Sequence, residues 1–266
     1  MAQRRRLDVE LVRRGLARSR AHADELVAAG RVMLAGQIAA KVATQVDPAA
    51  AIVVREIEGE PDFASRGGHK LAGALDAFAG LEVADRRCLD AGASTGGFTD
   101  VLLRRGAAHV IAVDVGYGQL VWSLQQDERV SVLDRTNVRE LTADQVPYPP
   151  DLVVADLSFI SLRLVLDPLV RVSVPGADLV LMVKPQFEVG RERLPQGGVV
   201  RSAADRAAAV RGIADAASEL GLGVRGVCAS PLPGPSGNVE YFLWLVAGAD
   251  PLREADLLRA VEEGPQ

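Results

Sequence analysis

Short apolar runs alternate with amphipathic stretches along most of the chain, from residue 86 to the C-terminal end. Runs of four to seven residues rich in valine and leucine are typical of buried strands, and the longer stretches repeat apolar positions at helical spacing. The expected strands are residues 87–90, 110–114, 130–133, 151–156, 177–183, 223–229 and 241–246. The expected helices are residues 97–105, 119–125, 161–170, 203–220 and 253–263. This alternation predicts a mostly parallel sheet with helices on both faces.

The first sixty residues follow another pattern, which predicts a small separate module. Apolar positions recur at helical spacing until Gly15, where the first helix is expected to end. Ser19 is the expected N-cap of a second helix, and Gly30 follows the end of that helix. Two short strands are expected at residues 31–36 and 51–55. The apolar residues that recur at helical spacing around this helix are Leu7, Leu11, Val12 and Leu16.

Proline and polar residues interrupt both kinds of periodicity around residues 59–62. We therefore expect a first domain of residues 1–60, a linker of residues 61–68 and a second domain of residues 69–266. A chain of 266 residues with 48% hydrophobic composition can bury a full α/β core beside a small module. The second domain is expected to start with a helix that carries Lys70 near its beginning.

The formal net charge of −5 conceals an uneven distribution of charge. Residues 1–41 contain nine Lys or Arg against four Asp or Glu and so carry +5, which leaves −10 for the rest of the chain. A basic module attached to an acidic domain indicates a polyanionic partner for the first part. No apolar run approaches the roughly 18 residues of a membrane-spanning helix, and no apolar segment follows the arginine-rich start. We therefore expect a soluble, cytoplasmic protein.

Neither the cysteines nor the histidines show the spacing of a metal site. Cys88 and Cys228 lie in apolar, strand-like segments, so they are expected to be buried thiols that form no disulfide. The three histidines are far apart in the sequence and have no partner at a recognisable ligand spacing. We expect no metal in the site.

The most informative segment is residues 90–98, DAGASTGGF, because an expected strand ends there in a glycine-rich turn. Such a turn lets backbone N–H groups approach a ligand closely, and Asp114 follows at the end of the next strand. The run lacks the Gly-x-Gly-x-x-Gly register of a dinucleotide site, which disfavours NAD(P). Asp90 suits the charged amino-acid end of S-adenosylmethionine, and Asp114 suits its ribose hydroxyls. A tight turn without a ligand is the alternative.

Five motifs, in order, resemble the TlyA family, also called hemolysin A. They are residues 90–99 (DAGASTGGFT), 114–120 (DVGYGQL), 156–161 (DLSFIS), 183–188 (VKPQFE) and 234–240 (GPSGNVE). The spacing of Arg6, Leu11, Gly15 and Arg20 also resembles the S4 RNA-binding fold. The resemblance implies an α/β fold, with a Rossmann-like class I methyltransferase sheet of the FtsJ type and a small N-terminal α+β S4 domain.

The implied activity is 2'-O-methylation of cytidine ribose in ribosomal RNA, with S-adenosylmethionine as the cofactor. The arginine-led N-terminus and the C-terminal helix resemble the members that act on both 23S and 16S RNA. The expected partners are therefore RNA within 50S and 30S subunits, and the protein is expected to be a monomer that binds neither membrane nor metal.

The family's Lys-Asp-Lys-Glu tetrad is matched by Lys70, Asp156, Lys184 and Glu240. A ribose hydroxyl is a poor nucleophile at neutral pH, so it must be oriented and relieved of its proton. Lys184 would release its own proton more readily beside a second lysine because like charges repel, and it is the expected proton acceptor. The two acids are expected to hold the lysines. For any one of these residues alone, a surface salt bridge is the alternative.

The resemblance also implies contacts to cofactor and RNA. The expected cofactor contacts are Asp90, Gly92, Ser94, Thr95, Gly96, Gly97, Phe98, Asp114, Asn137 and Asp156. The expected RNA contacts are Arg4, Arg6, Arg18, Arg20, Lys41, Arg66, Arg135, Phe159, Arg191 and Ser236. Phe159 could stack on a displaced base, since an enzyme acting on a paired nucleotide must move it out of its stack; core packing is the alternative.

The chain departs from the family pattern at residues 63–68, FASRGG, where an extra glycine is expected to loosen the placement of Lys70. Three other functions stay open. A membrane-active hemolysin is disfavoured because the sequence offers no span and no long amphipathic basic helix. A small-molecule O-methyltransferase would not need the basic module. A non-catalytic ribosome-binding factor would not need the tetrad.

Overall fold

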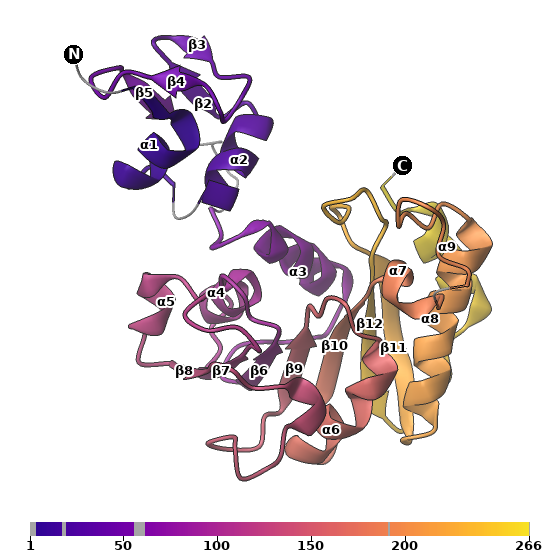
Figure 1. The fold of residues 1–266 in the computed structure, drawn as a ribbon. Coiled ribbons are helices and arrows are strands. Elements are labelled where there is room, and N and C mark those ends of the chain that lie inside the picture. The colour runs from indigo at the N-terminus through magenta and orange to yellow at the C-terminus, as the bar shows by residue number, and fades with distance from the viewer. Residues whose placement is uncertain (1–3, 18–19, 56–61, 191, 266) are drawn as a thin grey trace. The chain divides into compact units, whose positions relative to one another are not determined.

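The structure is a computed structural model that describes residues 4–17, 20–55, 62–190 and 192–265. The chain divides into two compact units, and the division falls between Asp62 and Phe63 (Figure 1). The helix α3 (Arg66–Ala77) begins inside the expected linker, because the side chain of Ser65 caps it by accepting a hydrogen bond from the backbone N–H of Gly67. Lys70 therefore lies in an ordered helical turn.

The first unit packs two helices against short strands around a small core. The expected helix ends are confirmed, since Gly15 and Gly30 take φ of +70° and +66° directly after the helices. The expected N-cap, Ser19, lies outside the described residues. Three strands of two residues each had no detectable sequence pattern and were not predicted. The elements are β1 (Arg5–Arg6), α1 (Leu7–Arg13), α2 (Arg20–Ala28), β2 (Val32–Leu34), β3 (Gln37–Ile38), β4 (Gln45–Val46) and β5 (Ile52–Val54).

The second unit is built on a seven-stranded sheet in the order β11-β12-β10-β9-β6-β7-β8. Neighbouring strands are parallel except at β12, which runs antiparallel to both of its neighbours. Each observed strand end lies within one residue of its expected position. The strands are β6 (Arg87–Ala91), β7 (His109–Val113), β8 (Val130–Leu133), β9 (Leu152–Ala155), β10 (Asp178–Val183), β11 (Leu222–Ala229) and β12 (Tyr241–Ala247).

Helices cover both faces of this sheet, so the predicted α/β architecture is confirmed (Figure 1). Alternate strand residues point to opposite faces; Leu89 packs in one core cluster and Cys88 in the other. One face carries α3, α4 (Gly97–Arg104) and α5 (Trp122–Gln125). The other face carries α6 (Leu166–Val172), α8 (Ala203–Ser218) and α9 (Glu254–Glu262).

Two expected helices are corrected by the structure. The helix expected at residues 161–170 is a 3-10 turn, η2 (Leu162–Leu164), followed by α6, because Pro168 fits the first turn of α6 but not the interior of a longer helix. The helix expected at residues 119–125 begins only at Trp122, because Asp114 and Asp134 bind backbone N–H groups of Gly116 and Gly118 and hold that segment as a loop.

Three further elements connect the sheet to the site. The sequence did not reveal α7 (Pro185–Glu188), a single turn directly after Lys184. A second 3-10 turn, η1 (Val138–Glu140), follows β8. The strand β6 lies between β7 and β9, so the strand order reverses beside it. Ligands of open α/β sheets bind at such a reversal, at the carboxyl ends of the strands.

Candidate active site

The glycine turn between β6 and α4 is formed at positions that no larger residue can occupy. Gly92 and Gly96 have φ of +87° and +100°, a backbone conformation that residues with side chains rarely adopt. A Cβ atom on Gly92 would lie 2.6 Å from the carbonyl oxygen of Asp156. The bare backbone of the turn is therefore packed directly against the residue that follows β9, and this contact brings two expected site segments together.

Asp90 is fully buried near the end of β6, directly before the glycine turn in the sequence. Its Oδ2 accepts a hydrogen bond of 2.7 Å from the hydroxyl of Thr99, and its Oδ1 has no partner among the described residues. Burial raises the pKa of Asp90 to about 7; the Thr99 hydrogen bond opposes the shift, and the negative charge of Asp156 adds to it. A buried carboxyl with one open oxygen suits a cationic ligand group.

We expect Asp90→Asn to stabilise the protein increasingly as the pH rises from about 4 to about 7. The pKa is raised from 3.8 to about 7 in the fold, so the folded state keeps the proton that the unfolded chain has lost. Stability due to the protonated carboxyl is full below pH 3.8 and is lost as the pH passes about 7. Thermal melts of both proteins across this range measure the difference. Parallel curves would contradict the raised pKa.

Asp114 organises the loop that follows β7. Its Oδ2 accepts a hydrogen bond of 2.8 Å from the N–H of Ser94 in the glycine turn. Its Oδ1 accepts one of 2.7 Å from the N–H of Gly116. Both expected cofactor loops are thus joined through one carboxylate, and each of its oxygens retains a lone pair that a hydroxyl group could reach.

Two other expected cofactor positions, Phe98 and Thr95, are engaged in contacts within the protein. Phe98 is buried, and its ring lies 6.0 Å from that of Phe242 in the core. Its side chain is thus part of the packing under α4, and only its N–H, in the first helical turn, remains for a ligand. The carbonyl oxygen of Thr95 accepts a hydrogen bond from the N–H of Val121.

The tetrad forms two separate ion pairs. Lys70 Nζ lies 2.5 Å from Glu240 Oε2, and these side chains are 7% and 1% exposed. Lys184 Nζ lies 2.5 Å from Asp156 Oδ1, with side chains that are 10% and 25% exposed. The structure thus joins residues 170 positions apart in the first pair and keeps them away from water. A plain surface salt bridge is excluded for Lys70 and Glu240.

The first turn of α3 lies near residues of both ion pairs. A Cβ atom on Gly67 would lie 3.7 Å from Asp156 Oδ2, and Gly67 precedes Lys70 by one helical turn. At Gly68 a Cβ atom would overlap the ring of Phe63. The expected loosening by this glycine is therefore wrong, because the aromatic ring fills the space that the missing side chain leaves.

Side chains that the sequence did not single out hold Lys184 and Glu240. The ammonium of Lys184 donates a hydrogen bond of 2.9 Å to Ser158 Oγ. The buried Asn238 accepts from the N–H of Val200 at 2.8 Å and donates to the carbonyl of Gly198 at 2.9 Å, which fixes the loop before Glu240. Both residues fall inside motifs already quoted, so the motif was the available signal.

Two expected RNA contacts lie at loop tips in the second unit. Phe159 is 92% exposed and has φ of +63°, so its packing in the core is excluded. Its ring lies 5.3 Å from that of Phe187 in α7. The guanidinium of Arg135 lies 4.4 Å above the ring of Tyr117 and is otherwise exposed. An aromatic side chain and a cation are thus presented outward.

Three further expected contact residues, Arg66, Ser236 and Asn137, also lie in the second unit. Arg66, the first residue of α3, reaches the carbonyl of Pro233 at 3.4 Å. Ser236 is exposed in the loop before Glu240. Asn137 caps η1, where its side chain accepts a hydrogen bond of 3.1 Å from the N–H of Arg139. The structure gives Asn137 a structural task, and its part in cofactor binding stays a prediction.

The N-terminal arginines differ in their partners. Asp8 is buried and binds the guanidinium groups of both Arg6 and Arg20, at 3.0 and 2.8 Å. These partners hold the pKa of Asp8 well below its usual range. Arg4 and Lys41 are exposed. The other two expected RNA contacts, Arg18 and Arg191, lie outside the described residues.

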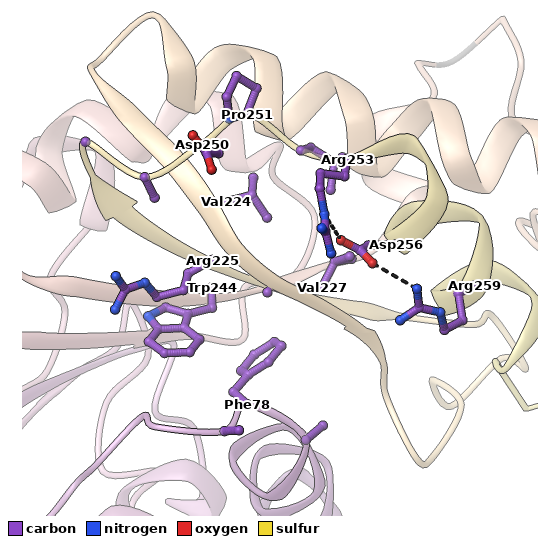
Figure 2. A pocket seen from close by; sticks show the side chains of 16 residues that line it. Phe78, Val224, Arg225, Val227, Trp244, Asp250, Pro251, Arg253, Asp256 and Arg259 are labelled. Carbon is purple, nitrogen blue, oxygen red and sulfur yellow. Dashed lines mark hydrogen bonds and ion pairs between the residues drawn. The ribbon is translucent and has the colours of Figure 1, made fainter.

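A separate groove of about 640 Å³ lies between the end of α3, β11 and the start of α9 (Figure 2). Phe78 and Trp244 form one side, and Arg225 projects beside them. Leu222 pairs with Ala247 at this end of the sheet, whereas Glu240 lies beyond the opposite end of β12. The groove is thus remote from the ion pairs, and we assign it no part in the tetrad's chemistry.

Two features that the described part of the chain lacks bear on other functions. No group of three or more His, Cys, Asp or Glu side chains is placed to hold a metal ion there. None of the helices there combines the length and apolar character that crossing a bilayer requires. Both cysteines are free, and burial raises the pKa of the Cys88 thiol to about 12; Cys228 is only partly buried.

Comparisons with known proteins match both units. The FtsJ-like methyltransferase family matches residues 63–247, and the S4 domain matches residues 5–52. A Mycobacterium tuberculosis protein named 16S/23S rRNA (cytidine-2'-O)-methyltransferase TlyA is 58% identical over 100% of each chain. A Bacillus subtilis protein provisionally named an rRNA methyltransferase is 41% identical over 98% of this chain and 94% of its own.

A solved structure shows the same arrangement of elements. It is a protein from Streptococcus thermophilus, provisionally described as a hemolysin, with a TM-score of 0.78 and 35% sequence identity. The match covers 99% of this chain and 96% of that chain. The likeness therefore includes every segment that forms the two ion pairs and the glycine turn.

Proposed function

The chain belongs to the TlyA family of FtsJ-like methyltransferases, and from this premise we propose that it methylates the ribose 2'-hydroxyl of a cytidine in ribosomal RNA with S-adenosylmethionine. The observation that carries the proposal is the pair of shielded ion pairs, Lys70 with Glu240 and Lys184 with Asp156, beside a glycine turn. Two lysines held by acids suit a reaction in which a hydroxyl group loses a proton.

The residues around the glycine turn fit S-adenosylmethionine. Asp90 offers a buried carboxyl oxygen with no partner among the described residues, which suits an ammonium group. Asp114 lies at the end of the next strand, where its carboxylate can accept from ribose hydroxyls. Gly92 and Gly96 carry no side chains, so the backbone is bare at these two positions of the turn. The bound cofactor supplies an electrophilic methyl group on a positively charged sulfur.

Lys184 is the proposed proton acceptor. Its ammonium is fixed by Asp156 at 2.5 Å and Ser158 at 2.9 Å. In the proposed step the neutral amine of Lys184 takes the proton of the ribose hydroxyl while the ribose oxygen forms a bond to the methyl carbon and the bond from that carbon to the cofactor sulfur breaks. Lys70, held by Glu240, contributes a positive potential that favours the forming ribose oxyanion. These steps need no metal.

The proposed substrates are 23S RNA in the 50S subunit and 16S RNA in the 30S subunit. The relative with 58% identity is named for both RNAs, and the likeness covers the whole chain. The basic S4 unit supports a folded RNA as the substrate, because Arg6, Arg20 and Lys41 provide cations on a module separate from the methyltransferase unit. We propose a first domain that ends near residue 60, followed by a short linker and a methyltransferase domain that includes the whole of α3.

Arg4→Ala and Lys41→Ala are expected to weaken binding to ribosomal subunits without changing the melting temperature. Both side chains are exposed, so their loss removes phosphate contacts and leaves the core intact. Each substitution should lower the slope of log K against log salt concentration by about 1. Filter binding at several salt concentrations measures the slope. The matched control is Arg211→Ala, an exposed arginine of α8 paired with Glu254; an equal loss in the control would refute a specific role.

The proposed function is tested by methyl transfer from radiolabelled S-adenosylmethionine to purified 30S and 50S subunits that lack the modification. Label should enter RNA, resist deproteinisation and map to a cytidine 2'-O-methyl nucleotide. Label on one subunit alone would narrow the substrate range. Absence of label on both subunits, with measurable cofactor binding, would refute the ribosomal activity.

The alternatives predict different results in the same preparation. A small-molecule methyltransferase would transfer label without RNA. A ribosome-binding factor would keep its biological effect when Lys184 is replaced. A hemolysin would lyse red cells as a pure protein. The ion pairs favour an enzyme, since a binding module would gain little stability from the buried pair of Lys70 with Glu240 or from the partly exposed pair of Lys184 with Asp156.

A further inference from the structure

The loop of residues 156–161 presents a phenylalanine in an unfavourable conformation. Phe159 has φ of +63°, in the left-handed region that costs a non-glycine residue free energy, and its ring is 92% exposed. Neither backbone preference nor burial of the ring favours this arrangement. The contacts that surround the loop must therefore hold it in place.

The first contacts lie at the start of the loop. The N–H of Asp156 donates to the carbonyl of Ala91 at 3.0 Å, and its carboxylate pairs with Lys184. Ser158 Oγ accepts from the same ammonium at 2.9 Å. The residue before Phe159 is thus held by the proposed proton acceptor itself. A shift of this loop would move the surroundings of Lys184 and of Phe159 together.

Glu188 holds the other end of the loop. Its Oε2 accepts a hydrogen bond of 2.6 Å from the hydroxyl of Ser161, and its Oε1 accepts one of 2.8 Å from the N–H of Leu162. Ser161 Oγ in turn accepts from the N–H of Arg163 and caps η2. A single carboxylate therefore fixes the residues at which the loop ends and η2 begins.

The helix α7 contacts the loop at two places. It follows Lys184 directly and has only four residues, Pro185–Glu188. Its last residue is Glu188, and the ring of the preceding Phe187 lies 5.3 Å from that of Phe159. The same short turn thus carries Lys184 at one end and supports both the tip and the end of the loop at the other.

We propose that Glu188 is a positioning residue that holds Phe159 in place for the substrate nucleotide. This inference rests on the proposed RNA methyltransferase activity. Both carboxylate oxygens of Glu188 are bonded to the loop, so in this proposal Glu188 acts through Ser161 and the backbone of Leu162. A base displaced from its stack requires an aromatic surface at a fixed place, and a loop free to turn would supply that surface only part of the time.

The test is a double-mutant cycle between Glu188→Ala and Phe159→Ala, measured as kcat and KM for ribosomal subunits. Each single substitution should lower kcat/KM about 10–100-fold, because misplacement of a positioning group by about 1 Å can cost 10²-fold. The kcat/KM of the double variant should lie within about threefold of that of the less active single variant, since both substitutions remove the same positioned aromatic ring. The Kd for S-adenosylmethionine should stay within about twofold of wild type in every variant.

Glu188→Gln is the matched conservative variant. Its amide oxygen can accept from the N–H of Leu162 and its NH₂ group can donate to Ser161 Oγ, so activity should return to within about fivefold of wild type. If Glu188→Ala does not fold, Ser161→Ala removes one of the two hydrogen bonds and replaces it in the cycle. Ser161→Ala should lower kcat/KM less than Glu188→Ala does. Combined with Phe159→Ala, it should cause no loss of kcat/KM beyond that of Phe159→Ala alone.

Each outcome decides between the inference and the function on which it rests. The positioning role would be refuted if the double variant lost kcat/KM by the product of the two single losses, or if Glu188→Ala were fully active, while the wild-type enzyme still methylates RNA. A parallel loss of cofactor binding would show a general structural role and refute it too. A wild-type protein that methylates neither subunit would instead refute the proposed function.

Discussion

Lys184→Ala is expected to lower kcat for methyl transfer to ribosomal subunits by about 10²–10⁴-fold, the usual contribution of a general acid or base. The side chain follows the end of β10 and is held by Asp156 and Ser158. We propose that Lys184, and no other described side chain, takes the proton of the ribose hydroxyl. Cofactor binding should persist, because the glycine turn, Asp90 and Asp114 lie at the ends of β6 and β7, whereas Lys184 follows β10. Single-turnover methylation and equilibrium dialysis with labelled cofactor measure the two properties.

Lys184→Arg separates proton transfer from charge. Arginine can keep the ion pair with Asp156, but its guanidinium stays protonated in proteins. The variant should therefore melt like the wild type and be as inactive as the alanine variant. Activity close to wild type in Lys184→Arg would mean that the residue acts through its positive charge alone, and the proposed proton transfer would be wrong.

Glu240→Ala is expected to lower the free energy of unfolding by about 3–5 kcal/mol, because it leaves the buried ammonium of Lys70 without its partner. The two side chains are 7% and 1% exposed, so water can do little to replace the lost carboxylate. For a unit of this size the melting temperature should fall by about 6–20 °C. Differential scanning calorimetry and chemical denaturation measure the loss.

The double variant Lys70→Met, Glu240→Leu should recover most of that stability and none of the activity. Replacing a buried ion pair with apolar residues of similar volume is often neutral or stabilising, because the cost of removing both charges from water disappears. The matched control is the exposed pair Arg211 with Glu254, whose removal should change stability by less than about 1 kcal/mol. An active double variant would refute a catalytic role for this pair.

Local pattern was sufficient for the strands of the second unit. A buried strand such as β9, Leu152–Ala155, has only apolar residues between polar ends, and few alternative structures bury such a run. Predicted helices failed where a local interaction overrode the pattern. Pro168 interrupts the helix expected at residues 161–170, and the carboxylate of Asp114 binds the loop before α5.

The candidate site was identified in part from motifs and in part only from contacts. The motifs name Lys70, Asp156, Lys184 and Glu240, but their division into two pairs depends on which strand ends are neighbours in the sheet. Glu188 lies in a quoted motif, but the sequence indicates no role for it, since a carboxylate next to a phenylalanine matches no functional pattern. Its role becomes visible only through its two hydrogen bonds to residues more than 25 positions away.

The sequence by itself determined the strands of the second unit, where the basic charge lies, which family the motifs resemble and which residues form the tetrad. These properties depend on interactions within a few residues, on composition and on motif order, all of which are present in the linear chain. Only the tertiary structure decided the partners: Lys70 with Glu240, Lys184 with Asp156 and Ser158, and Phe159 held outward between Lys184 and Glu188. Partners are set by strand order and by close packing, which join residues remote in sequence and leave no periodic signal in it.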